Sequence, residues 1–224
     1  MAPLSPVVAR WELMLRLRER RKDLGVTPAT IAKRLHISSG YWAHIEGERN
    51  LLSEAKLKQL LPLLEFDQAE TQELLDLRLA AKERGWWAQY SGLMGTELMR
   101  LYGLEHGAVS IRTFESVVIP GLLQCKSYAR ALIASSMANV RAAEVDQRVA
   151  VRLRRQQRLN GDHPLHLTAV IGQTALVQQT GGPAVLREQL NHLIDAIEQH
   201  ADTIDLRVIP FDSPEGNVLG GATF

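Results

Sequence analysis

Two short helix-forming segments joined by a turn, within residues 24–50 (LGVTPATIAKRLHISSGYWAHIEGERN), constrain the fold of this chain more than any other feature. The first helix should begin at Thr27, whose hydroxyl can accept a hydrogen bond from a free helix amide, with Pro28 at the first helical position. Ile31, Ala32 and Leu35 should face inward. The turn follows at residues 36–38, where an apolar Ile can hold two crossing helices together.

The second helix should start after a serine cap, either Ser38 or Ser39. Trp42 and Ile45 are three residues apart, so both should face the core. The outward positions are candidates for contacts with base edges in a DNA major groove: Ser39, Gly40, Tyr41 and His44. The motif therefore predicts binding to double-stranded DNA. A homodimer is expected, since one short recognition helix contacts few bases.

Polar and basic residues flank the second helix and are candidates for phosphate contacts, which fix the register of a protein on DNA. They are Thr27, Lys33, Arg34, Ser38, Arg49 and Asn50. The second helix has no outward Arg, Lys, Asn or Gln, the side chains that make most bidentate base contacts. Sequence-specific reading is therefore expected to be modest.

A basic helix should precede the motif over residues 6–24, and a leucine-rich helix should follow it around residues 57–64. The net charge of the whole chain is only +1, but residues 1–60 hold 11 Lys and Arg against 6 Asp and Glu, and the rest hold 15 against 19. The basic surplus lies where DNA would bind. A solvated helix face would have the same composition.

The first third of the chain resembles the phage-repressor-like (XRE) helix-turn-helix family. The resemblance rests on Arg21, residues 25–27, Ile31–Ala32, Leu35, Ile37–Ser38, Ile45–Glu46 and Arg49. The chain departs from the family at Pro28, where a DNA-contacting Gln is common. It departs again at Gly47, which comes one residue early, so the recognition helix is expected to end early at this glycine.

A helix containing Leu74, Leu77 and Ala81 should end near Gly85, and this places a domain boundary between residues 1–84 and 85–224. Trp86 and Trp87 follow at once. They are candidates for stacking on a ligand or nucleic acid, and the alternative, docking of one domain on another, is favoured.

The second domain mixes periodicities. We expect strands at 109–118, 165–171 and 204–208, and helices at 97–106, at about 140–159 and after the turn Gly181–Gly182. The predicted fold class is mainly α, with an N-terminal helix-turn-helix bundle followed by a mixed α+β domain.

This second part is similar to an actinobacterial domain of unknown function that follows an XRE motif in antitoxin-like regulators. The shared stretches are Trp86–Trp87; Glu115 with Ile119–Gln124 and Tyr128–Arg130; Arg152 with Arg155–Gln156; and Leu176, Gly181–Gly182, Gln189–Leu190 and Val208–Pro210. The resemblance implies a small protein partner encoded nearby. The chain departs at Gly172–Gln173, where the family has acidic residues. It also stops at Gly220–Phe224, where the family continues, so either the protein is short or this sequence is incomplete. An unfinished sheet would leave a bare edge that could pair with another strand.

Four arginines of the expected helix at 140–159 are spaced by seven, four and three residues and should share one face: Arg141, Arg148, Arg152 and Arg155. This face could meet a small acidic protein or a phosphate group. The favoured alternative is that these side chains form salt bridges to the domain's own carboxylates or lie in solvent.

Other classes of function lack support in the sequence. Cys125 is the only cysteine, which excludes an internal disulfide, and no 18-residue apolar run or signal peptide is present, so the protein is expected to be cytoplasmic. No catalytic template occurs, and His163 and His166 flank a proline at a strand entrance, which does not suit a metal site. We therefore expect a transcriptional regulator without enzymatic activity, cofactor or metal. The alternative is a helix-turn-helix converted into a protein- or substrate-binding module, or a pathway enzyme.

Overall fold

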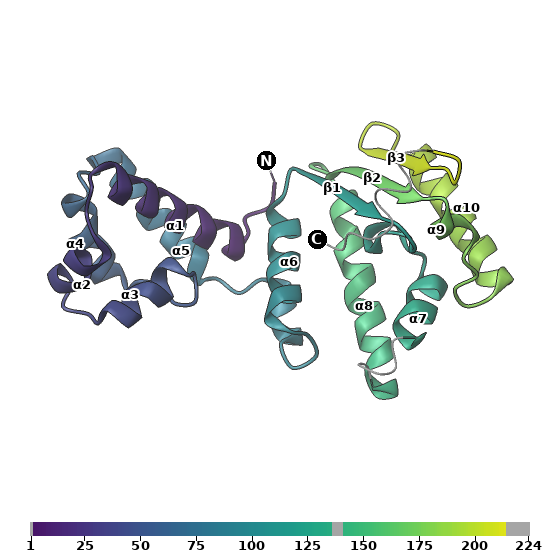
Figure 1. Cartoon of the computed structure of the whole chain (residues 1–224), viewed down its shortest axis with the longest axis horizontal. Coiled ribbons are helices and arrows are strands. Elements are labelled where there is room, and N and C mark those ends of the chain that lie inside the picture. Colours follow the sequence, from purple (N-terminus) through teal and green to yellow (C-terminus); the bar gives the residue numbers. More distant parts are fainter. Residues whose placement is uncertain (1, 136–140, 214–224) are drawn as a thin grey trace. The chain divides into compact units, whose positions relative to one another are not determined.

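The computed structural model describes residues 2–135 and 141–213 and divides the chain into two compact units, residues 3–107 and residues 108 onward. The first unit is all-helical, and the second combines a small sheet with helices (Figure 1). The predicted fold class is thus confirmed. The expectations that concern Val140 and Gly220–Phe224 lie outside the described residues.

The N-terminal unit is built from six α-helices and one 3₁₀ helix within its described residues. They are α1 (Pro6–Asp23), α2 (Pro28–Arg34), α3 (Ser39–Glu46), α4 (Glu54–Leu63), α5 (Gln68–Lys82), η1 (Trp86–Tyr90) and α6 (Thr96–Gly107). The helices α2 and α3, with the turn between them, form the predicted helix-turn-helix.

Side chains cap the first turns of the five bundle helices. The capping residues are Ser5, Thr27, Ser38, Ser53 and Asp67. Each accepts a hydrogen bond from a backbone amide that has no partner inside the helix, which is why the helices begin where they do. The predicted cap at Thr27 is confirmed, and of the two serines considered for α3, Ser38 is the cap.

The first four helices end with a residue in the left-handed conformation, at φ 64° for Gly25, 50° for His36, 58° for Glu48 and 55° for Glu65. In each case the next amide reaches back over the last helical turn, as Arg49 N does to His44 O at 2.8 Å. The recognition helix ends at Gly47 as expected, since Gly47 is the C-cap of α3. The left-handed residue is not this glycine, which has φ −82°, but the next one, Glu48.

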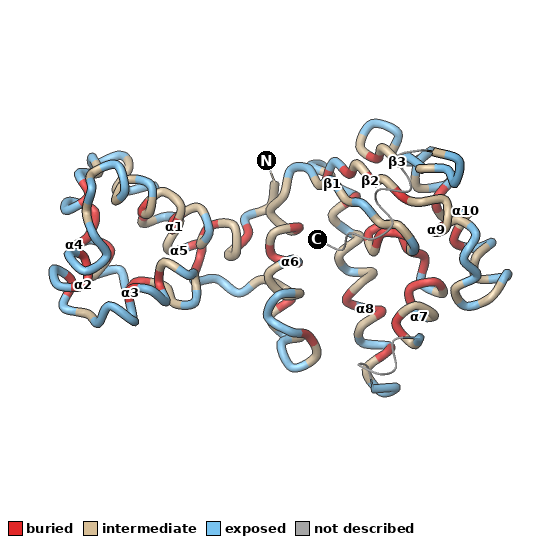
Figure 2. The backbone as a smooth tube through the Cα atoms, viewed as in Figure 1, coloured by how far each residue is buried: buried red, intermediate tan, exposed pale blue. Residues whose placement is uncertain are grey.

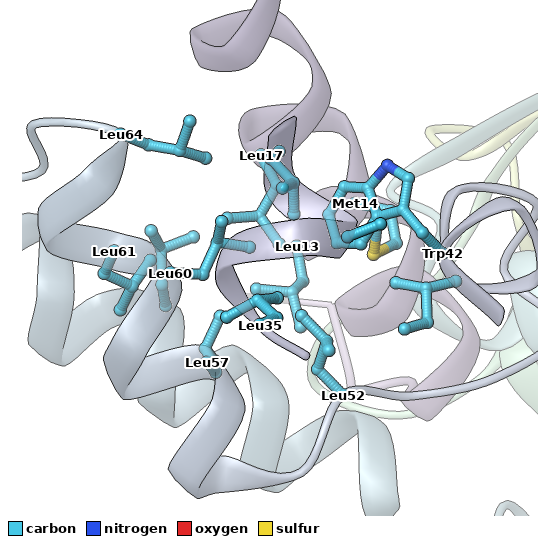
Figure 3. Packing of buried hydrophobic residues seen from close by; sticks show 14 residues of the cluster. Leu13, Met14, Leu17, Leu35, Trp42, Leu52, Leu57, Leu60, Leu61 and Leu64 are labelled. Atoms are coloured by element: carbon cyan, nitrogen blue, oxygen red, sulfur yellow. The ribbon is translucent and has the colours of Figure 1, made fainter. Parts of the chain in front are cut away.

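Buried leucines from α1 and α4, together with inward residues of α2 and α3, form the core of the N-terminal unit (Figure 3). Figure 2 marks buried positions along these helices in red. Ile31, Ala32 and Leu35 are buried as predicted, and so are Trp42 and Ile45. The core therefore fixes which side of α3 remains at the surface.

The N-terminal unit continues through α6 to Gly107, past the boundary expected near residue 85. The tryptophans explain this extension. Trp86 stacks on Tyr102 of α6 with ring centroids 6.1 Å apart, and Trp87 is buried with its ring edge against His106. The aromatic residues placed at the boundary thus dock α6 within this unit.

The second unit consists of three strands with helices between them. Its elements are β1 (Ser110–Glu115), η2 (Gly121–Leu123), α7 (Lys126–Ser135), η3 (Ala142–Glu144), α8 (Val145–Gln156), η4 (Gln157–Leu159), β2 (His166–Gly172), α9 (Thr174–Val177), α10 (Pro183–Gln199) and β3 (Ile204–Ile209). The three predicted strands are confirmed. The helix expected from about residue 140 is shorter: its α-helical part begins at Val145, after a 3₁₀ turn.

The three strands pair in parallel in the order β1-β2-β3. Parallel neighbours need long crossover connections, and α7–α8 and α9–α10 provide them. Leu167, Ala169 and Ile171 of β2 are buried in the core, as their alternation predicted, while Thr168 and Val170 between them are half-buried.

Candidate nucleic-acid interface

The recognition helix α3 has one side in the core and one side at the surface. Trp42 and Ile45 lie on its core-facing side, with 2% and 0% of their surface exposed. The four residues predicted to meet base edges are all exposed: Ser39, Gly40, Tyr41 and His44. The structure thus brings these four residues together on a solvent-facing surface. That arrangement is what a helix lying in a major groove requires.

Three cations beside α3 are available to bind phosphate. Lys33 and Arg34 end α2, and Arg49 follows α3. All three are exposed, and no hydrogen bond or ion pair of their side chains is found within the described residues. Free cations at both ends of a recognition helix suit contacts with the two flanking phosphate strands.

The other phosphate candidates have structural roles as well. Thr27 Oγ1 accepts a hydrogen bond from Thr30 N at 3.2 Å, and Ser38 Oγ accepts one from Tyr41 N at 3.0 Å. Asn50 is half-buried, and its backbone N–H donates a hydrogen bond to His44 O. Both hydroxyls are exposed at the N-termini of α2 and α3, where partial positive charge favours an anion.

The arginines of α1 do not form a free basic surface. Arg16 pairs with Glu73 and Arg20 with Glu70, at N–O distances of 3.0 and 2.5 Å. Arg20 also lies over the ring of Phe66. Carboxylates of α5, distant in sequence, therefore neutralise part of the basic surplus of residues 1–60.

Two further arginines of α1 hold the end of the recognition helix. Arg21 Nε donates to Glu46 Oε1 at 2.9 Å, and Arg18 donates to the Glu46 carbonyl oxygen at 2.9 Å. Sequence reasoning missed this role. Glu46 lies 25 residues from Arg21, so no local pattern links them.

In the second unit, two of the motif stretches form one hydrogen-bond network. Arg152 of α8 donates to Gln124 Oε1 at 2.6 Å, and Gln156 donates to the carbonyl oxygens of Gly121 and Gln124. Arg155 lies over Gly121: a Cβ atom added there would be 3.3 Å from its guanidinium. The network holds the loop after β1 on α8.

The predicted four-arginine face does not exist as such. Arg141 precedes the helix and is 88% exposed, because the α-helix begins only at Val145. Arg148 pairs with Glu144 at 3.1 Å, and Arg152 binds Gln124. Arg141 lies 3.6 Å from Glu144 as well, so pairing with the domain's own carboxylates is found for Arg141 and Arg148, whereas Arg152 binds an amide oxygen.

Polar residues also lie at the carboxyl ends of the strands. Glu115 ends β1, and partial burial raises the pKa of its carboxyl group. Gln173, at the position where the resembled family has acidic residues, accepts a hydrogen bond from Phe211 N at 2.8 Å and so links the ends of β2 and β3. A neutral amide oxygen is sufficient for this contact.

Comparison with known families agrees with the two-unit architecture. Residues 12–74 match a family model described as a helix-turn-helix domain, and residues 98–224 match a domain of unknown function (DUF5753). No curated protein and no solved structure matches the chain significantly.

The matched helix-turn-helix, with its exposed recognition helix, suggests a DNA-binding regulator. Because the second match spans more than half of the chain, the protein belongs to the family defined by this domain of unknown function. In the part of the chain that the structure describes, no helix is both long and apolar enough to cross a membrane.

Proposed function

We propose that the protein is a sequence-specific transcriptional regulator of the antitoxin-like, XRE-related type, acting in the cytoplasm through α3. One observation carries the proposal. The arginines of α1 bind partners within the protein, whereas Lys33, Arg34 and Arg49 beside the recognition helix have no partner among the described residues. Exposed, unpaired cations beside an exposed recognition helix favour a phosphate-binding surface.

A homodimer is part of the proposal. The recognition helix has only eight residues and carries Tyr41 and His44 as its largest outward side chains. Two-fold pairing would double the number of base contacts, at half-sites about 34 Å apart. In the described sheet β1 and β3 are the outer strands, and each offers an edge for pairing with a second subunit or partner strand.

The C-terminal domain is proposed to bind a small protein or a ligand that controls DNA binding. This part rests on the family resemblance. The internal contacts of Arg148 and Arg152 reduce the case for an acidic partner at α8.

The test is a fluorescence-anisotropy titration of the full chain against its own upstream DNA and a scrambled duplex, at low and physiological salt. We expect selective binding that weakens steeply with salt. Arg34→Ala and Arg49→Ala should weaken binding to both duplexes and lower the salt slope by about 0.9 for each phosphate that the variant no longer neutralises. Tyr41→Phe and His44→Ala should change the preference between duplexes.

Arg187→Ala is the matched control, because Arg187 is an exposed arginine of α10 in the other unit. It should bind as the parent does. Equal affinity of the parent for both duplexes would contradict the proposed function. Binding unaffected by all four substitutions would contradict the site.

A further inference from the structure

Helix α6 belongs by sequence to the matched C-terminal family domain and by packing to the N-terminal unit. It spans Thr96–Gly107, almost wholly within the matched domain of unknown function, which begins at residue 98. It nevertheless packs within the N-terminal unit, against α1. Only Ala108 and Val109 separate it from β1. The first helix of the C-terminal family domain is therefore a structural part of the DNA-binding unit.

Two glycines allow α6 to approach α1 closely. A Cβ atom added at Gly103 would lie 2.6 Å from Val7 Cβ, and one at Gly107 would lie 2.7 Å from Ser5 Cβ. Real Cβ atoms do not approach this closely, so even alanine would force the helices apart. The buried Ser5 hydroxyl, which caps α1, also donates to the Gly103 carbonyl oxygen at 2.5 Å. The contact is thus specific as well as close.

The same helix contacts the segment that directly follows the recognition helix. Arg100 forms an ion pair with Glu48, at an N–O distance of 2.5 Å, and the Glu48 side chain is only 11% exposed. Arg10 of α1 donates to the Glu48 carbonyl oxygen at 3.4 Å. Glu48 is the residue that ends α3 in a left-handed conformation, at φ 58°, which is unfavourable for a side chain other than glycine.

We propose that α6 is a clamp that sets the position of the recognition helix, with Arg100 as its positioning residue. Arg100 and Arg10 bind Glu48 and so fix the backbone that follows α3. Gly103 and Gly107 allow α6 to pack closely on α1. A partner of the C-terminal domain then controls DNA binding by strengthening or releasing this clamp through the two residues before β1. The regulatory part rests on the proposed function, and the clamp itself does not.

The clamp is tested without DNA by hydrogen exchange of the full chain. The amides of residues 47–50 report on the exit of α3, since each donates a backbone hydrogen bond there. Gly103→Ala and Arg100→Glu should speed their exchange by about 10-fold, while amides of Leu60 and Leu61 in α4 stay protected. The matched control is Gly92→Ala, because an added Cβ there meets nothing within 4 Å. Exchange as slow as in Gly92→Ala would overturn the clamp.

DNA binding then tests the regulatory part. Arg100→Glu and Glu48→Arg should each weaken affinity for the selected duplex by about 10-fold, and the double charge reversal should restore most of it. A merely structural loss would not be rescued by the swap. If the single variants exchange fast but bind DNA normally, control through α6 is overturned. If the parent shows no selective binding, the proposed function fails while the exchange result still decides the clamp.

Discussion

Arg21 of α1 and Glu46, the last residue of the recognition helix, form an ion pair that is largely shielded from solvent. Arg21 Nε and Glu46 Oε1 are 2.9 Å apart, and their side chains are 12% and 21% exposed. The same guanidinium donates to the Val26 carbonyl oxygen at the entrance of the helix-turn-helix. One side chain therefore joins both ends of the motif.

Glu46→Gln should lower the free energy of unfolding by about 1–2 kcal/mol, because it leaves the shielded Arg21 without its charged partner. The matched control is Glu73→Gln in the Arg16–Glu73 pair, whose side chains are 28% and 64% exposed. That change should stay within about 0.5 kcal/mol, since exposed pairs contribute little. Urea denaturation measures both. Equal effects would show that shielding does not determine the strength of these pairs.

The residues with positive φ at the helix ends predict opposite effects of glycine and alanine substitutions on stability. Gly25→Ala should destabilise the protein by about 1 kcal/mol: an added Cβ has space, but φ is 64°. Glu65→Gly at φ 55° should raise the melting temperature, since it relieves the same strain. Thermal unfolding compares the two variants with Gly92→Ala. A destabilising Glu65→Gly would mean that the flexibility of glycine in the unfolded chain outweighs this relief.

Gln189 holds the loop before α7 from inside the second core. Its side chain is fully buried, accepting from Cys125 N and donating to Leu123 O, both at 2.8 Å. Gln189→Leu should cost about 2–5 kcal/mol, because two buried backbone groups lose their partners. Asn191→Leu, at an exposed position of the same helix, should be nearly neutral. Denaturant unfolding of the full chain should show this contrast. A mild effect of Gln189→Leu would indicate that the loop rearranges.

Glu115 predicts a pH dependence of stability. Burial raises the pKa of its carboxyl group in the folded protein, so the folded state binds this proton more tightly than the unfolded chain. The stabilisation that the protonated Glu115 provides is therefore present below the ordinary Glu pKa of about 4.3. It is lost as the pH rises from there through the raised pKa of the folded state. Glu115→Gln should match the parent near pH 4 and melt at a higher temperature at pH 7. A lower melting temperature at pH 7 would show that the carboxylate has a stabilising partner.

Much of the local structure could be predicted from the sequence, because its causes are local. Thr27 and Ser38 precede helices they can cap, and both caps are present. The alternation of Leu167, Ala169 and Ile171 predicted a strand with one buried face, since successive side chains of a strand point to opposite faces. The same reasoning predicted the inward side of α3 and, by elimination, its outward residues.

Contacts between residues distant in the chain were decided only by the tertiary structure. The sequence shows that Arg16, Arg20 and Arg21 are basic, but only folding brings Glu73, Glu70 and Glu46 to them. A row of charges has the same pattern whether it is paired or free. The sequence predicted Lys33, Arg34 and Arg49 as phosphate candidates, but only the structure shows that their side chains have no partner among the described residues.

The assignment of α6 has the same physical reason. The amphipathic pattern of residues 97–106 predicts a helix, because helix periodicity is a local property. Its packing partner depends on whether Gly103 meets a surface that a Cβ atom would not fit, and that surface is built by Val7, 96 residues earlier. The sequence by itself thus determined where the helices and strands form, and the tertiary structure decided which charges stay free and which unit α6 joins.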